Sequence, residues 1–191
     1  MEPNNTRRNL LDAASRVVAR DGVAKLTLDA VARETGMSKG TVLYHFHTKD
    51  ALIEGMVESM VARADANIAA QVRAHEGDRT PGHWLRAFIR ATPMPLAEGD
   101  DPSAGLVAAI GINPALMDGA RIRYAGWQAR VEGDGLDPAL ATLLRLAADG
   151  LWACEVFGLA PPTGELRERV IARMLELATP GGASAPPPGA G

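Results

Sequence analysis

The residues whose types and spacing could do chemistry lie mainly between positions 27 and 49. Hydroxyl side chains stand there directly before helix-forming runs, and a lysine follows two of them in the sequence. Hydroxyls, ammonium groups and the free N–H groups of a helix start are donors that proteins direct at phosphate oxygens and base edges. The residues expected to act in this way, with one glycine that lets the backbone come close, are Thr27, Ser38, Lys39, Gly40, Thr41, Tyr44, His45, Thr48 and Lys49.

The sequence offers little for catalysis or metal binding. The single cysteine, Cys154, falls in an apolar helical stripe, where we expect a structural or interface role rather than a nucleophile. His45 and His47 lie two positions apart at a predicted helix end, on different sides, so a metal pair is not expected. The acidic loop at 98–101 is most simply a solvated turn. We therefore expect no enzyme, no cofactor and no metal ion.

The charge of the chain is unevenly distributed, which matters more than its net value of −3. Residues 1–50 hold eight Lys/Arg against six Asp/Glu, whereas residues 51–191 hold twelve against seventeen. All three lysines, Lys25, Lys39 and Lys49, lie in the first segment. A mildly basic head on an acidic body is consistent with a protein whose head alone approaches phosphate groups.

Composition also indicates where such a protein works. No apolar run approaches the roughly 18 to 20 residues that a membrane span needs. Charges interrupt the apolar positions near the N-terminus, so no signal-peptide core is evident. One cysteine excludes an intramolecular disulfide and fits a reducing compartment. We expect a cytoplasmic protein with no membrane partner.

The elements that must position these residues are all predicted to be helices. Apolar residues recur at a spacing of three to four almost throughout, and no segment alternates as a strand does. The tail from Pro180 is rich in Pro, Gly and Ala and is expected to be disordered. The predicted helices cover about 6–20, 28–35, 38–45, 48–70, 81–92, 103–112, 114–131, 138–158 and 163–178.

The second and third of these helices form a helix-turn-helix pattern. They are short, and about three residues around a glycine join them. Gly36 stands where the chain leaves the second helix, a position that favours a left-handed backbone. Ser38 is then placed to cap the third helix, as Thr27 is for the second. Thr48 and Lys49 set a cap and a cation side by side at the start of the fourth, as a phosphate clamp requires.

The ordered segments T-L-D-A-V-A-R-E-T-G, M-S-K-G-T-V-L-Y-H-F and T-K-D-A-L, within about residues 6–60, resemble the TetR (tetracycline repressor) family of one-component regulators. The resemblance implies that residues 38–45 are a recognition helix in the DNA major groove. It implies that Lys39, Gly40 and Thr41 approach bases. Thr27, Tyr44, His45 and Lys49 would then contact the DNA backbone.

Two positions depart from the family pattern. The family commonly has tyrosine where Leu43 stands, and often proline or glycine where His47 stands. The tyrosine of this chain, Tyr44, comes one place later, so its phosphate contact differs from the usual one.

Beyond residue 60 the resemblance weakens, and two assignments come from the apolar pattern together with the family. Members dimerise through their last two helices, and the corresponding helices here are apolar on more than one face. The alternative is that both faces are buried within one subunit. The residues expected at a dimer interface are Leu140, Leu144, Leu151, Val170 and Met174.

The middle of the chain holds most of the aromatic and sulfur side chains. A mostly apolar chamber with a few polar groups is the usual form of a ligand site, and family members bind an inducer between their middle helices. Ordinary core packing is the alternative for each residue. The candidates are Trp84, Phe88, Met94, Met117, Tyr124 and Trp127.

Together these observations predict an all-α protein with a three-helix DNA-binding head and a C-terminal ligand-binding and dimerisation bundle. The predicted divisions are 1–50 for the head, 51–179 for the bundle and 180–191 for the tail. The expected function is a homodimeric repressor that binds a near-palindromic double-stranded DNA operator and is released by a small, partly apolar effector. An all-helical small-molecule-binding protein or enzyme is the alternative.

Overall fold

The computed structural model describes residues 3–92, 103, 106, 110 and 113–182, with side chains from Asn5 onward. Of the predicted helix at 103–112, Ser103, Leu106 and Ile110 are described and are helical. Met94, the acidic loop at 98–101 and the tail from residue 183 lie outside the described residues.

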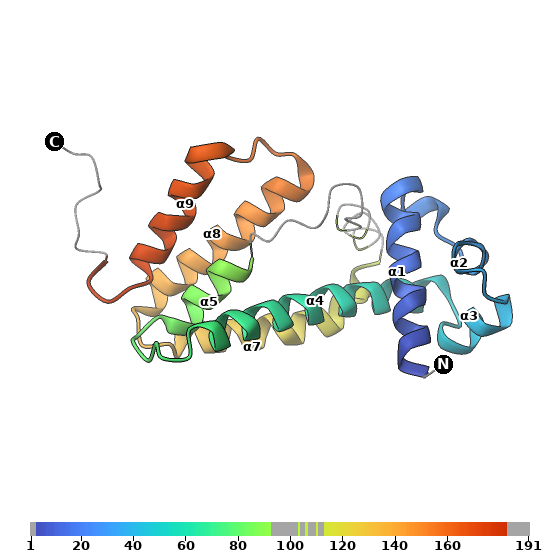
Figure 1. Cartoon of the computed structure of the whole chain (residues 1–191), viewed down its shortest axis with the longest axis horizontal. Helices are drawn as coiled ribbons and strands as arrows, with labels where there is room; N and C mark the ends of the chain where they lie inside the picture. The colour runs from blue at the N-terminus through green and yellow to red at the C-terminus, as the bar shows by residue number, and fades with distance from the viewer. Residues whose placement is uncertain (1–2, 93–102, 104–105, 107–109, 111–112, 183–191) are drawn as a thin grey trace. The chain divides into compact units, whose positions relative to one another are not determined.

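All elements of the described part of the chain are helices, which confirms the predicted fold class (Figure 1). None of these helices is long and apolar enough to cross a membrane. In chain order they are α1 (Pro3–Asp21), the 3₁₀ turn η1 (Val23–Lys25), α2 (Leu28–Thr35), α3 (Lys39–His45), α4 (Lys49–Ala74), α5 (His83–Ala91), the 3₁₀ turn η2 (Pro114–Met117), α7 (Asp118–Glu132), α8 (Pro138–Phe157) and α9 (Gly164–Leu177).

Some helices begin at residues other than those predicted. The first helix begins at Pro3 rather than near Asn5, which is compatible with proline's tolerance in the first helical turn. The fifth begins at His83, after a left-handed Gly82, rather than at Pro81. Thr163 precedes α9 but makes no side-chain cap hydrogen bond.

The chain divides into two compact units, and each is described by itself. The first comprises Met1–Arg63 and Pro95–Arg123, and the second comprises Ala64–Met94 and Tyr124–Gly191. The predicted head at 1–50 lies within the first unit, and the boundary at residue 51 stays a prediction.

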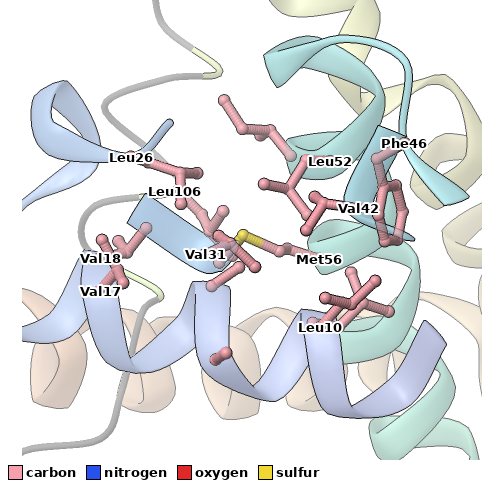
Figure 2. Close-up of a cluster of buried hydrophobic side chains, with 14 of the residues drawn as sticks. Leu10, Val17, Val18, Leu26, Val31, Val42, Phe46, Leu52, Met56 and Leu106 are labelled. Atoms are coloured by element: carbon pink, nitrogen blue, oxygen red, sulfur yellow. The ribbon is translucent and has the colours of Figure 1, made fainter. Parts of the chain in front are cut away.

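The head is held together by one buried apolar cluster (Figure 2). α1 contributes residues at a spacing of three to four, so a single stripe faces inward. α2, α3 and the start of α4 cover that stripe, and the completely buried Leu106 joins from the middle of the chain. Each large side chain buried in this way contributes about 1.5–3 kcal/mol. Among the members are Leu10, Val17, Val18, Leu26, Val31, Val42, Phe46, Leu52 and Met56.

In the second unit α5 is the central helix and packs against both α8 and α9 (Figure 1). Seven of its nine residues are buried, so α5 is enclosed on nearly all sides. The stripe of α8 that turns inward consists of Ala141, Leu144, Ala148 and Leu151, which again follow the helical spacing of three to four.

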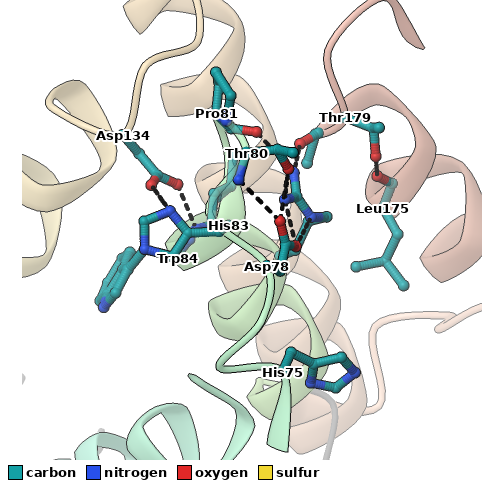
Figure 3. A network of polar contacts seen from close by, with 12 residues as sticks. His75, Asp78, Thr80, Pro81, His83, Trp84, Asp134, Leu175 and Thr179 are labelled. Atoms are coloured by element: carbon teal, nitrogen blue, oxygen red, sulfur yellow. Dashed lines mark hydrogen bonds and ion pairs between the residues drawn. The ribbon is translucent and has the colours of Figure 1, made fainter. Parts of the chain in front are cut away.

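The start of α5 is capped by a residue 50 positions away (Figure 3). The buried carboxylate of Asp134 accepts hydrogen bonds from the backbone N–H groups of Trp84 at 3.3 Å and Leu85 at 2.8 Å. Asp134 thereby satisfies donors that the α5 start would otherwise leave free. Gly82 is required just before, because its φ is +83° and a Cβ there would lie 2.2 Å from the carbonyl oxygen of Ala178.

A buried arginine beside this cap ties the α4–α5 connection to the end of α9. Arg86 donates to Asp78 at 2.6 Å, to Thr80 Oγ1 at 2.7 Å and to the carbonyl oxygen of Ala178 at 2.5 Å. Hydrogen bonds from Thr80 and then from Arg86 hold the pKa of Asp78 well below its usual value.

Candidate functional site

The turn between α2 and α3 has the local structure that its residues predict. Thr27 Oγ1 accepts a hydrogen bond from the Ala30 N–H at 3.0 Å, and Ser38 Oγ accepts one from the Thr41 N–H at 3.1 Å. Gly36 ends α2 in the left-handed conformation, with φ 67° and ψ 14°. These three features confirm the predicted caps and the predicted glycine, and they fix the direction in which α3 leaves the turn.

α3 presents one buried and one exposed face. Val42 is completely buried in the head cluster, whereas Lys39, Gly40, Leu43 and Tyr44 are exposed. Tyr44 is 77% exposed, and its ring contacts the edge of the neighbouring His45 ring, with 5.1 Å between centroids. The exposed face therefore combines an ammonium group, a phenol and a leucine around a position without a side chain.

Two of the predicted base-contacting groups are already paired within the head. Lys39 Nζ lies 3.0 Å from Oδ1 of Asp29, and both side chains are more than half exposed. Thr41 Oγ1 shares a hydrogen bond with Ser38 Oγ at 2.9 Å. A DNA contact by Lys39 would therefore compete with Asp29, which the sequence pattern alone does not reveal.

The start of α4 has the predicted cap at Thr48, and Lys49 beside it also makes a hydrogen bond within the head. Thr48 Oγ1 accepts from the Ala51 N–H at 3.0 Å, which confirms the cap. Lys49 Nζ donates to the carbonyl oxygen of Val23 at 2.7 Å and so ties η1 to α4. An ammonium group has three protons, so this bond leaves donors for a phosphate.

The predicted chamber residues of the second unit form a continuous aromatic row. Neighbouring ring centroids lie 5.8 Å apart for Trp84 and Phe88, 5.8 Å for Phe88 and Trp127, and 4.6 Å for Tyr124 and Trp127. Trp84, Phe88 and Trp127 are buried, and Tyr124 is half-buried. Met117 belongs to the first unit, outside this row.

Polar groups that the sequence pattern did not single out adjoin the row. Trp127 Nε1 donates to Asp65 Oδ1 at 2.6 Å. Burial, followed by the charge of Asp149, raises the pKa of Tyr124 to about 12. Burial also raises the pKa of Asp149, although Arg145 binds that carboxylate at 2.6 Å. The row therefore has acidic groups close by, whose positions depend on packing between distant helices.

The predicted interface residues mostly face the interior of their own chain. Leu144, Leu151 and Met174 are buried, while Leu140 and Val170 are half-buried. Leu144 and Leu151 lie on the inward stripe of α8 and Met174 is the buried residue of α9, so their own chain encloses all three, and their place at a dimer interface stays a prediction. The large apolar side chains that are exposed instead define a surface that we call the α8–α9 patch: Leu143, Leu146, Phe157, Leu159 and Leu166.

In the described part of the chain, no group of three or more His, Cys, Asp or Glu side chains could hold a metal ion. That the protein needs no metal stays a prediction.

Comparison with known proteins assigns both parts of the chain to the same family. Residues 82–179 match the family described as "Tetracyclin repressor-like, C-terminal domain", and residues 10–56 match "Bacterial regulatory proteins, tetR family". The chain is 36% identical over 58 residues to the HTH-type transcriptional regulator SrpR of Pseudomonas putida, a stretch that is 30% of this chain and 27% of that protein. The first curated relatives are covered over only 27–43% of their length.

Two further relatives match over most of the chain. The HTH-type transcriptional regulator BetI of Brucella abortus (strain 2308) is 26% identical over 172 residues, which are 90% of this chain and 74% of that protein. The crystal structure of the multidrug binding protein EbrR complexed with imidazole is 26% identical, with a TM-score of 0.60 and coverage of 96% of this chain and 97% of that one. Because a family match spans more than half of the chain and another covers its head, the chain belongs to the TetR family.

Proposed function

We propose that this TetR-family chain is a transcriptional repressor that binds a near-palindromic DNA operator as a homodimer and is released by a small, partly apolar effector. The observation that carries the proposal is the capped α2–turn–α3 unit, which holds donor side chains on the exposed face of α3. Helices presented in this way enter the major groove in helix-turn-helix proteins.

The head contains the separate groups that DNA binding needs. On α3, Lys39, Gly40 and Thr41 approach bases, and Tyr44 and His45 approach the DNA backbone. At the starts of α2 and α4, Thr27 and Lys49 add phosphate contacts beside free backbone N–H groups. Phosphate contacts position the head, and contacts to base edges select the sequence.

A second copy of the chain is the partner that the α8–α9 patch fits. Leu143 is 65% exposed and Leu166 is 57% exposed, and a protein partner is what would cover several large apolar side chains exposed on two consecutive helices. Between them α8 exposes the small residues Ala147 and Gly150, which allow another helix to come close. Dimerisation would set two recognition helices about 34–36 Å apart, one turn of DNA.

The aromatic row supports the effector part of the proposal. Four rings in contact, with Asp65 hydrogen-bonded to Trp127 and Asp149 close to Tyr124, offer apolar surface and acidic groups to a small molecule. EbrR, a relative of similar length, is described as a multidrug binding protein and holds imidazole. An effector that separates these rings would displace α5 from α7, and because α5 packs against α8 and α9, the displacement would alter the dimer.

Selection of duplexes from random-sequence DNA tests the operator claim. We expect the full-length protein to enrich a two-fold symmetric sequence, and we expect Lys39→Met or Thr41→Ala to change the preferred bases. Enrichment of no sequence would contradict the proposal, and so would turnover of a metabolite without DNA binding.

Sedimentation tests the homodimer separately. Leu143→Glu places a charge in the α8–α9 patch and is expected to give folded monomers with weakened operator binding. Glu168→Gln, at another exposed position of α9, is the control and should remain dimeric. A monomeric wild type would contradict this part of the proposal.

A further inference from the structure

Leu43 is an apolar side chain in the middle of the exposed face of α3. With about 100° per residue, the exposed residues Lys39, Leu43, Gly40 and Tyr44 span an arc of about 140° in that order. Leu43 and Gly40 occupy the middle of the arc, and Lys39 and Tyr44 occupy its edges. Leu43 is 37% exposed, whereas the adjacent Val42 is completely buried.

The surroundings of Leu43 leave room for a close partner. The position of a Cβ on Gly40 has one atom within 4 Å, Ser38 Oγ at 3.6 Å, so the surface is open beside the leucine. Of the neighbouring polar groups, Lys39 already binds Asp29 and Thr41 already binds Ser38, whereas the exposed Tyr44 lies at the edge of the arc. A base pair opposite the middle of the arc would therefore face a hydrocarbon side chain.

Only one common feature of the major groove suits such a side chain. Phosphate oxygens and most base edges offer hydrogen-bond donors or acceptors, which leucine cannot satisfy. The C5-methyl group of thymine is the apolar exception. Contact between the two removes both from water.

We propose that Leu43 determines part of the DNA specificity by packing against the methyl group of a thymine in each half-site. The proposal rests on the proposed function, since it requires α3 to lie in the major groove. It adds a base-reading residue to Lys39, Gly40 and Thr41, and this residue reads shape and apolarity rather than hydrogen bonds.

Replacement of thymine by uracil tests the contact, because uracil lacks only the methyl group. An operator duplex selected by the full-length protein is prepared with each thymine of one half-site changed to uracil in turn, and affinities are measured by fluorescence anisotropy. For the wild type we expect one position at which uracil weakens binding about four-fold, equivalent to about 0.8 kcal/mol for one methyl-sized group. For Leu43→Ala we expect equal affinity for the duplex with thymine and the duplex with uracil at that position.

Two further variants separate a base contact from a general loss of binding. Leu43→Met keeps an apolar side chain and should keep the preference for thymine. Ile122→Ala removes an exposed apolar side chain of α7, outside the proposed interfaces, and should leave the whole uracil profile unchanged. Circular dichroism checks that each variant is folded.

The outcomes distinguish this inference from the proposed function. Sequence-selective binding with no uracil-sensitive position, or with equal sensitivity in wild type and Leu43→Ala, overturns the role of Leu43 alone. Failure to select any duplex overturns the proposed function, and the role of Leu43 with it.

Discussion

The ion pair between Lys39 and Asp29 should lower the affinity for DNA, and removal of the ion pair should raise that affinity. Lys39 Nζ lies 3.0 Å from Asp29 Oδ1, with side chains 60% and 54% exposed. A phosphate or base edge that takes Lys39 must replace this partner. In Asp29→Asn the ammonium group of Lys39 has no ion-pair partner at position 29 before DNA binds, so DNA no longer competes with a carboxylate for Lys39.

The size of the gain follows from the exposure of the pair. Ion pairs at exposed sites contribute about 0.2–1 kcal/mol, which corresponds to at most about a five-fold gain in affinity. Because salt screens exposed charges, the gain should be largest at low ionic strength. If Lys39 then neutralises one more phosphate, the slope of log affinity against log salt becomes steeper by up to about 0.9.

Anisotropy titrations of a selected duplex at several salt concentrations measure both effects. Asp12→Asn, an exposed acid of α1, makes the same change in net charge and serves as the control. Adding Asp29→Asn to Lys39→Met should give no gain. Weaker binding by Asp29→Asn, or an equal gain in Asp12→Asn, would show that Asp29 does not compete with DNA for Lys39.

Three further predictions follow from single contacts. Lys49→Ala should lower the salt slope by about one unit across all DNA sequences, and an unchanged slope in the folded variant would remove Lys49 from the phosphate contacts. Arg86→Leu should lower the free energy of unfolding in urea by about 3 kcal/mol, because Asp78 loses its ion-pair partner and the Ala178 carbonyl loses the donor from Arg86. The exposed Arg79→Leu should change that free energy little, and a loss below about 1 kcal/mol for Arg86→Leu would contradict the role of the network. Absorbance titration should show Tyr124 ionising near pH 12, and this phase should be missing from Tyr124→Phe. Since the pKa of Tyr124 is raised in the folded protein, the contribution of Tyr124 to stability is present below about pH 10 and is lost as the pH rises above it. A late phase that persists in Tyr124→Phe would disprove the assignment.

The features that sequence predicts best are those that depend on a few neighbouring residues. The caps at Thr27, Ser38 and Thr48 and the left-handed Gly36 were all found as predicted, because each needs only the backbone within three or four positions. Thr163 also stands before a helix but makes no cap hydrogen bond, and that helix begins with Gly164 at a φ of +53°.

The features that sequence could not provide depend on residues far apart in the chain. Lys49 meets a carbonyl 26 positions earlier, and Arg86 meets one 92 positions later. Packing against α5 determines which face of α8 is buried. Because α8 has leucines on two sides, its own sequence does not indicate which of the two is buried. For this reason the dimer proposal moves from Leu144 and Leu151 to the α8–α9 patch.

One pair of titrations shows whether the protein binds DNA sequence-specifically as a dimer. A selected duplex and a scrambled duplex of the same composition are titrated with full-length protein at physiological salt, and sedimentation gives the number of chains per duplex. We expect two chains per selected duplex and a preference for that duplex of about 10³-fold or more. Equal affinity for the two duplexes would contradict this expectation.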